Sequence, residues 1–417
     1  MKPRTSLNCH RNRFVAPLSI CIWLSSAISA FGQSGEPVRT IEASKFASLQ
    51  AALDAVPASG GIVRIAPGTF ELTEPLVVKT GDTRIEGSGT STHLVNKNTK
   101  GQPAVIIAPA TLANDPKAEL WRVQIANLRI SGNLESGDGI LARKVQEILV
   151  QAVSLDHNGG NGIHLDNCFE DPRINDNILT YNAKAGLQIT VGHDIVVSGN
   201  QFEENQDAIR CIDSYNLCAT GNAIDDHLRH GIVIEDTYGS VVSGNMIEEC
   251  NGTAIILDRD CYGIALSSNV IAHHLGGGID LKDANGCSVS ANSFVLCHGF
   301  AIRMGPESGR NSVAGNAFAN TYIGGGKLKR PIREHKNPLQ IDTGAGIVLE
   351  SAGDVAITGN TFTGLDTQAV MATGGSRKIL VSNNILTECA RRMPADTRWI
   401  DLGDSLESVQ KDNLGSK

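Results

Sequence analysis

The sequence predicts an all-β chain wound as a right-handed parallel β-helix of about ten coils, with about 23 residues in each coil. Two short patterns and the constant distance between them carry this prediction. The first is an apolar residue, a small residue, Gly or a similar residue, Asn, any residue and an apolar residue, as in VSGNQF and ITGNTF. The second is Gly or Ala followed by alternating aliphatic residues, as in GIHLD and GIVIE.

The asparagine of the first pattern recurs at nearly constant intervals. Successive asparagines are 22–24 residues apart, except for one interval of 44 residues. The second pattern begins 14 or 15 residues before the asparagine in every coil that has both. Two markers that stay in phase over nine coils indicate one repeated structural unit. The asparagines are Asn177, Asn200, Asn222, Asn245, Asn269, Asn292, Asn316, Asn360 and Asn384.

The composition of the repeat favours strands over helices. Alternating segments of three to five residues make strands too short to be stable alone, so we expect three per coil, with coils stacked about 4.8 Å apart. Gly and Asn suit the bends because both tolerate positive φ, and a stacked Asn can hydrogen-bond to the bends above and below it. Helical repeats of similar length are excluded because no helical period is present.

The two ends of the stack differ from its middle. Residues 33–138 are expected to form an N-terminal cap and the first coils, with a capping helix over residues 44–55. Residues 139–392 form the regular coils, interrupted at 321–345 by a basic segment that is either a loop over a cleft or one degenerate coil; the loop is favoured. Residues 393–417 close the last coil.

Residues 1–32 have the features of a secretory signal peptide: a basic start, an apolar run and small residues before the expected cleavage point. The apolar run is short for a membrane span and no second such segment follows it. The sequence therefore predicts a secreted or periplasmic protein. Of the ten cysteines, eight lie beyond the signal, and their spacing fits no zinc pattern; most are expected to be buried as small apolar residues, with one or two disulfides left open.

Charge limits the partners. The chain has 36 basic and 44 acidic side chains, and its first 32 residues hold four basic ones and no acidic one, so the remainder carries a net charge of −12. This argues against nucleic acid, which requires a basic surface. It leaves open an anionic sugar, because a local basic cleft can still bind one. We expect a monomer.

The cap around residues 41–95 and the coils of residues 139–392 resemble the pectin lyase-like superfamily, which includes pectate lyases, polygalacturonases and alginate epimerases. The resemblance covers most of the chain beyond the signal. It is specific for the fold and weak for the activity, because this fold supports many chemistries. The polygalacturonase and alginate epimerase motifs are not complete here, and the calcium-binding carboxylates of pectate lyases have no residue-by-residue match. The resemblance implies a groove on the face formed by the second pattern.

The outward positions of that pattern supply the candidate catalytic residues. Charge is concentrated on its fourth to eighth coils, and two histidines of the preceding turns are candidate proton carriers. The alternative is that these charges pair as surface salt bridges, with Arg303 beside Asp280 and Lys282 beside Asp258. The candidate catalytic residues are Arg210, His230, Glu235, Asp258, His274, Asp280 and Arg303.

A second set could bind substrate. Three tyrosines occupy one repeat position in consecutive coils, where they either fill a turn or offer aromatic faces to sugar rings. The candidate substrate-binding residues are Tyr215, Tyr238, Tyr262, Lys282, Arg330 and Arg333.

Three functions fit these residues. The favoured one is a polysaccharide lyase or epimerase acting on a uronate-containing polysaccharide, with Arg210 or Arg303 neutralising the carboxylate and His230 or His274 as the base. The second is a glycoside hydrolase that uses Glu235 and Asp258, which lie in adjacent coils. The third is a non-catalytic sugar-binding or surface protein. No metal ligand and no certain cofactor is assigned, and calcium is left open.

Overall fold

The computed structural model describes residues 39–320 and 343–415. The chain divides into Met1–Pro37 and Val38–Lys417, and only the second unit contains described residues. The expected signal peptide and the candidates Arg330 and Arg333 lie outside the described residues.

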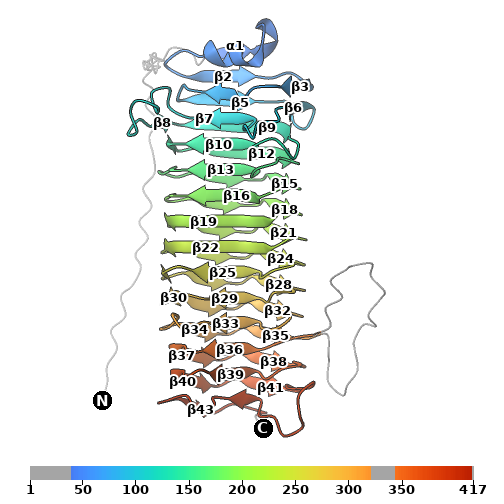
Figure 1. The fold of residues 1–417 in the computed structure, drawn as a ribbon, viewed down its shortest axis with the longest axis vertical. Coiled ribbons are helices and arrows are strands. Elements are labelled where there is room, and N and C mark those ends of the chain that lie inside the picture. Colours follow the sequence, from blue (N-terminus) through green and yellow to red (C-terminus); the bar gives the residue numbers. More distant parts are fainter. Residues whose placement is uncertain (1–38, 321–342, 416–417) are drawn as a thin grey trace, which may run out of the picture. The chain divides into compact units, whose positions relative to one another are not determined.

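The described residues form a parallel β-helix, in which strands from successive coils pair in parallel register in three ladders. Figure 1 shows the strands stacked from α1 to β43. The first ladder, formed by the pattern GIxLx, contains β4 (Leu76–Val78), β7 (Val105–Ile107), β10 (Ile140–Arg143), β13 (Ile163–Asp166), β16 (Ala185–Thr190), β19 (Asp207–Tyr215), β22 (His230–Tyr238), β25 (Ile255–Asp258), β29 (Ile279–Leu281), β33 (Ile302–Met304), β36 (Ile347–Glu350), β39 (Val370–Thr373) and β42 (Ile400–Asp401).

The other two ladders flank the asparagine bend. The one before the bend contains β1 (Thr40–Glu42), β2 (Gly61–Arg64), β5 (Thr83–Glu86), β9 (Val123–Ser131), β12 (Leu149–Asp156), β14 (Arg173–Asn175), β17 (Val196–Ser198), β20 (Cys218–Thr220), β23 (Val241–Ser243), β27 (Ala265–Ser267), β31 (Ser288–Ser290), β34 (Ser312–Ala314), β37 (Gly353–Thr358), β40 (Arg377–Ser382) and β43 (Val409–Lys411). The one after it contains β3 (Gly68–Leu72), β6 (Thr92–Asn96), β15 (Ile178–Thr180), β18 (Gln201–Glu203), β21 (Ala223–Asp225), β24 (Met246–Glu248), β28 (Val270–Ala272), β32 (Ser293–Val295), β35 (Ala317–Ala319), β38 (Thr361–Thr363) and β41 (Ile385–Thr387), and it shares β9 and β12.

Short strands extend these ladders locally. A two-stranded sheet pairs β8 with β11, and β26 and β30 prolong the first ladder at its edge. Their bounds are β8 (Leu120–Trp121), β11 (Val145–Gln146), β26 (Cys261–Tyr262) and β30 (Ala284–Asn285).

The stack is longer than the predicted ten coils. In the described part of the chain, 13 strands follow one another in the first ladder. The three strands beyond those of the ten counted coils are β4 and β7, which lie in residues 33–138 where the first coils were expected, and β42, which lies in the C-terminal segment.

All three ladders bypass the basic insertion. Ile302 pairs directly with Ile347, Ser312 with Ala356 and Ala317 with Thr361. No coil thus intervenes between these strands, although residues 321–342 themselves lie outside the described residues.

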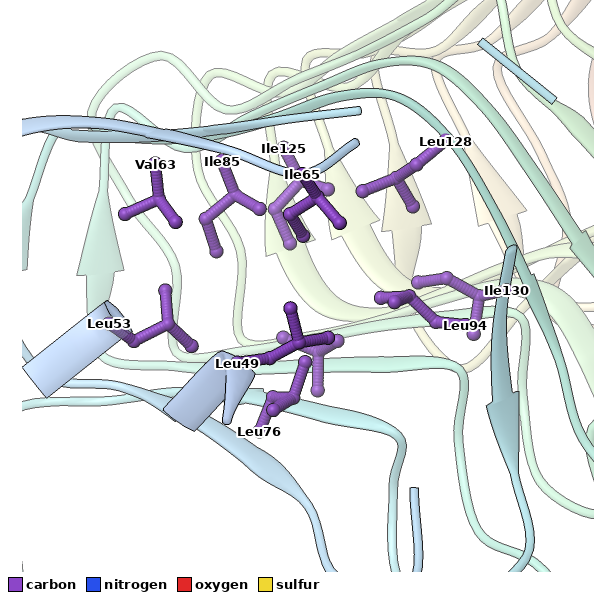
Figure 2. Close-up of a pocket in the computed structure, with 11 residues that line it drawn as sticks. Leu49, Leu53, Val63, Ile65, Leu76, Ile85, Leu94, Ile125, Leu128 and Ile130 are labelled. Carbon is purple, nitrogen blue, oxygen red and sulfur yellow. The ribbon is translucent and has the colours of Figure 1, made fainter. Parts of the chain in front are cut away.

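A short helix covers the N-terminal end of the core, as predicted, but it is shorter than residues 44–55. A 3-10 turn (η1, Ala43–Lys45) precedes α1 (Leu49–Asp54), because the Ser48 hydroxyl accepts the N–H of Ala51 at 3.1 Å and starts the helix there. Figure 2 shows Leu49 and Leu53 of α1 facing aliphatic side chains of the first coils. The cavity between them is about 10 Å³, so the cap seals the core with an apolar contact. At the other end, Trp399 packs against the core.

The alternating aliphatic residues point inward, as expected from strand geometry. Ile232, Ile234, Ile255 and Leu257 are fully buried. Their burial along 13 strands produces one continuous core that runs the length of the stack. Within it, Phe294, Phe318 and Phe362 stack face to face with ring centroids 4.6–4.8 Å apart, close to the spacing of the coils.

The asparagines form a buried hydrogen-bonded ladder. The Asn222 side-chain amide donates to Asn245 Oδ1 at 2.9 Å and to the Val197 carbonyl at 3.1 Å. Its Oδ1 accepts from the backbone N–H and the side-chain amide of Asn200. The same pattern runs from Asn177 to Asn413. Every polar group of the bend is therefore paired inside the stack.

The bend itself uses positive φ at one position, that of the residue before the asparagine. Gly199 and Gly244 have φ of 66° there, and Ser268 and Ala291 have φ of 57° and 55°. The ladder asparagines do not have positive φ, so of the two residues expected to tolerate it only the first uses it. Positive φ is strained for non-glycine residues, and the hydrogen bonds of the asparagine ladder hold the backbone in that conformation.

The eight cysteines of the described residues are all free thiols. Seven are buried, as predicted for small apolar residues, and Cys218 is half-buried. Burial raises the pKa of Cys168 and Cys297 to about 12. Among the described residues, no helix has the length and apolar character required to span a membrane.

Removing one rung of the asparagine ladder should destabilise the fold strongly. The variant Asn222→Ala removes the acceptor for the backbone N–H and side-chain amide of Asn200 and the donor to the Val197 carbonyl in the core, and we expect a loss of about 2–4 kcal/mol. Denaturant unfolding followed by circular dichroism measures this loss. The exposed Asn251→Ala is the control, with an expected change within about 0.5 kcal/mol. Equal effects of the two variants would contradict a special role for the ladder.

Candidate functional site

The outward surface of five adjacent first-ladder strands, β19, β22, β25, β29 and β33, is called the strand face here. Figure 1 shows these strands side by side in the lower half of the stack. Register places Glu235 beside Asp258 and Asp280 beside Arg303. The face thus brings together six predicted site residues: Arg210, Glu235, Asp258, Asp280, Lys282 and Arg303.

Arg210 lies at the centre of an ion-pair network. Its guanidinium contacts Glu235 at 3.0 Å and Asp207 at 3.4 Å. Glu235 also contacts Arg259 at 3.4 Å, and Asp207 accepts a bidentate pair of hydrogen bonds from Arg229. Arg210 is therefore held in place by carboxylates on two strands, which orients its guanidinium over the face.

The sequence analysis missed Asp207, the buried anchor of this network. Its side chain is fully buried, and it also accepts the backbone N–H of His230 at 3.0 Å. Burial alone would raise the pKa of Asp207, but the hydrogen bond and charge of Arg229 outweigh burial and lower it. Its acidic side chain directly before a GIxLx strand, a position that Asp138 also occupies in an earlier coil, was the available signal.

His230 has a defined proton arrangement. Its Nδ1 accepts the backbone N–H of Thr253 at 3.0 Å, so a neutral ring carries its proton on Nε2. Burial lowers the pKa of His230, and the positive charges of Arg229, Lys282 and Arg210 act in the same direction. The ring is therefore a neutral hydrogen-bond donor near pH 7. Contrary to its expected role, it does not offer Nε2 as a base.

The other predicted charges of the face form the ion pairs that the alternative interpretation expected. Arg303 donates to both oxygens of the buried Asp280, at 3.0 and 2.5 Å, and lies over the Phe300 ring at 4.5 Å. Lys282 contacts Asp258 at 3.7 Å. The Asp258 pair is the longer of the two and its side chains are more exposed.

The middle of the face is covered. Val233 and Ile256 point outward between Arg210 and Asp280, yet they are only 3% and 4% exposed. Long charged side chains on neighbouring strands shield such positions. Val233 and Ile256 therefore form an apolar surface that is covered by the paired charged side chains of the strand face.

His274, a predicted catalytic residue, is fully buried, and its Nε2 lies 3.0 Å from the Ile247 carbonyl oxygen. Burial lowers its pKa to about 4, which keeps the ring neutral, so Nε2 is the donor to that carbonyl. A side chain in the core cannot contact a polysaccharide. His274 therefore lies apart from the strand face.

The turn between the third and first ladders carries an acidic cluster. Two groups bring three potential ligand atoms within 4.8 Å of one another and share Glu249: Glu248, Glu249 and His273, and Asp225, Asp226 and Glu249. Calcium takes six to eight oxygen ligands, more than either group supplies. Calcium thus stays a hypothesis, with these five residues as its candidate ligands.

The carboxyl groups of the acidic cluster lie close together, and this shifts their pKa values. Burial and the neighbouring Asp226 and Glu248 raise the pKa of Asp225 to about 6. The same causes raise the pKa of Glu249 to about 7. His273 is held by Glu248 at 2.8 Å, and that contact raises the pKa of the imidazole.

The tyrosines stack as predicted. Ring centroids of Tyr215 and Tyr238 are 5.2 Å apart, and those of Tyr238 and Tyr262 are 4.9 Å apart, with nearly parallel planes. His193 covers the other side of Tyr215 at 3.8 Å. The inner ring faces are therefore in mutual contact, and the stack presents ring edges to solvent rather than three open sugar platforms.

The sequence pattern described as "Right handed beta helix region" matches residues 117–270 and 230–391, together well over half of the chain. The chain belongs to this right-handed β-helix family. No curated protein matches the sequence.

Solved structures share the fold at low identity. A double mutant of the periplasmic alginate epimerase AlgG superposes with a TM-score of 0.57 at 16% identity, covering 83% of each chain. The Agl-KA catalytic domain gives a TM-score of 0.57 at 13% identity, covering 90% of this chain and 69% of that one. A mutant of DFA-IIIase from Arthrobacter chlorophenolicus A6 gives 0.51 at 11% identity, covering 71% and 84%. At these identities, the similarities show that the chain shares the β-helix fold with these proteins.

The acidic cluster should make stability depend on pH. A carboxyl whose folded pKa is raised binds its proton more tightly when folded, so stability is highest below the unfolded pKa of about 4 and falls as pH rises through 6 to 7. The variant Glu249→Gln removes one charge, and we expect a higher melting temperature than wild type at pH 8 and little difference at pH 4. Thermal unfolding at both pH values measures this. The exposed Glu74→Gln should show no such pH-dependent gain; a lower melting temperature of Glu249→Gln at pH 8 would contradict the expected repulsion.

Proposed function

We propose that this protein is an exported carbohydrate-active enzyme that acts on a uronate-containing polysaccharide by β-elimination or C5 epimerisation. The observation that carries the proposal is that Asp207 holds both a cation and a neutral hydrogen-bond donor on adjacent strands: its carboxylate contacts the Arg210 guanidinium and accepts the backbone N–H of His230. Both reactions begin by removing the C5 proton of a uronate, which requires its carboxylate to be neutralised. The fold is shared with a periplasmic alginate epimerase, which supports the substrate class.

Arg210 is the neutralising group. Its guanidinium is oriented by Asp207 and Glu235, and its side chain is 22% exposed. A carboxylate that replaces part of the contact with Glu235 would still find a preorganised planar donor. Lys282, whose charge acts on His230, is the second cation near this position.

His230 stabilises the leaving oxygen in elimination. As the C4–O bond breaks, the electron pair of the broken C5–H bond forms the new C=C bond, the leaving oxygen accepts a hydrogen bond from the neutral Nε2–H, and a water molecule protonates that oxygen. The base must be another group, because the Nδ1 of His230 is bonded to Thr253. We assign this role to Asp258, since Glu235 is held by two arginines and Asp280 by a bidentate one.

A hydrolase is less well supported by the same geometry. Glu235 and Asp258 pair in register, so their backbones lie about 5 Å apart, as a pair of catalytic carboxylates would require. Hydrolysis, however, needs one carboxyl to donate a proton, and the two arginine contacts of Glu235 favour its anion. A non-catalytic sugar-binding protein is the remaining alternative, favoured by the complete pairing of charges on the strand face.

The test is a product assay on alginate, polygalacturonate and glycosaminoglycans. We expect a rise in ultraviolet absorbance from the new C=C bond, or exchange of the C5 hydrogen with solvent deuterium if the product is an epimer. The variants Arg210→Gln and His230→Ala should lower kcat/KM by about 100-fold or more, because each removes a group that acts on the reacting atoms.

His298→Ala is the matched control, because His298 is an exposed turn histidine that contacts Thr343 away from the network. It should retain wild-type activity. New reducing ends without absorbance or exchange would favour the hydrolase instead. Loss of all three signals in wild type on the whole panel would overturn both enzymatic proposals.

A further inference from the structure

The tyrosine stack belongs to a longer column of residues at the edge of the first ladder. Beyond Tyr262, the register continues one coil at a time through Asn285, Gly309 and Gly353 to Arg377. Two successive rungs of this column therefore have no side chain. At about 4.8 Å per rung, the gap extends about 10 Å along the stack.

A groove of about 440 Å³ lies at this gap. This volume falls within the usual range of about 300–1,000 Å³ for small-ligand sites. The lining is polar, and it is contributed by four successive coils: Asn285, Pro306, Glu307, Ser308, Gly309, Arg310, Ser351, Gly353, Asp354, Gly375 and Arg377. The hollow thus includes the two glycine rungs of the column, and all of its residues belong to the described part of the chain.

Two arginines of the groove differ from those of the strand face. Arg210, Arg229 and Arg303 are each paired with a carboxylate. Among the described residues, neither Arg310 nor Arg377 has a carboxylate partner; Arg310 donates only to the neutral Asn285 Oδ1 at 3.2 Å. Both are exposed. Their guanidinium groups can therefore contact an anion without first breaking an ion pair.

The groove also has acceptors for sugar hydroxyls, the carboxylates of Glu307 and Asp354. Asp354 contacts Lys378 at 3.8 Å, which partly neutralises it. The Arg377 side chain extends over the Gly353 rung, because a Cβ added at Gly353 would lie 3.4 Å from it. The groove is therefore elongated along the stack.

We propose that this groove binds an acidic sugar residue of a polysaccharide, with its carboxylate on Arg310 and Arg377. This proposal rests on the uronate substrate class of the proposed function and adds a binding subsite to it, beyond the strand face. Tyr238 and Tyr262 lie along the same column, so their exposed ring edges flank the path from the strand face to the groove. A chain running parallel to the stack would contact both.

Direct binding tests the subsite independently of catalysis. Oligogalacturonate and oligomannuronate, with a neutral cello-oligosaccharide as comparison, are titrated into the full-length protein by isothermal calorimetry. We expect wild type to bind an acidic oligosaccharide and Arg377→Gln to weaken its Kd about 10-fold, the scale of one charge-assisted contact. Gly353→Leu should weaken it at least as much by filling the groove. Arg39→Gln, which removes an exposed arginine in the first coil, should leave Kd unchanged.

Gly353→Leu adds a side chain at a position with ordinary backbone φ, and circular dichroism and thermal unfolding check its folding. Unchanged acidic-oligosaccharide affinity in both groove variants overturns the subsite, even if the absorbance assay shows elimination. Selective loss of that affinity supports the subsite, even if no elimination or exchange is seen. Equal binding of the neutral oligosaccharide to all variants, with no acidic binding to wild type, also overturns it.

Discussion

Hydrogen bonds between successive coils are the constraint on which this molecule depends. A single coil has three short strands and cannot bury its own apolar side chains, so its stability comes from its neighbours above and below. The asparagine ladder, fully paired from Asn177 to Asn413, fixes the register of those neighbours at the bend. Because register is fixed, equivalent residues of every coil lie in columns, and the asparagine, phenylalanine and tyrosine stacks follow from that one condition.

The same columns impose an electrostatic cost that the protein handles in two ways. On the strand face, carboxylates pair with basic side chains, and Arg210 and Arg303 are neutralised by carboxylates of adjacent strands. In the acidic cluster, like charges occupy adjacent coils, and the raised pKa values of Asp225 and Glu249 relieve part of the repulsion by favouring their protonated forms. In the groove at Gly309 and Gly353, Arg310 and Arg377 have no carboxylate partner among the described residues, so both are available to a ligand.

Features that repeat from coil to coil can be predicted from the sequence, whereas contacts that depend on the path of a single turn cannot. The coil architecture, the tyrosine stack and the ion pair of Arg303 with Asp280 follow from phase alone, and the structure contains each of them. The burial of His274, the central position of Asp207 and the Nδ1 contact of His230 depend on how a turn enters its strand, and no repeat pattern encodes that path. The first coils were expected within residues 33–138, but their number was not predicted because those residues lack the regular asparagine spacing by which the later coils are recognised.

The free cysteines provide the stack with internal reporters. Buried thiols with a pKa near 12 hold almost no thiolate at neutral pH, so they react with alkylating reagents only when their coil opens. Cys168 lies early in the regular stack, Cys250 and Cys261 near its middle, and Cys389 close to its end. The order in which these thiols become labelled would therefore record whether the solenoid frays from its ends or separates at an internal seam, without any engineered probe.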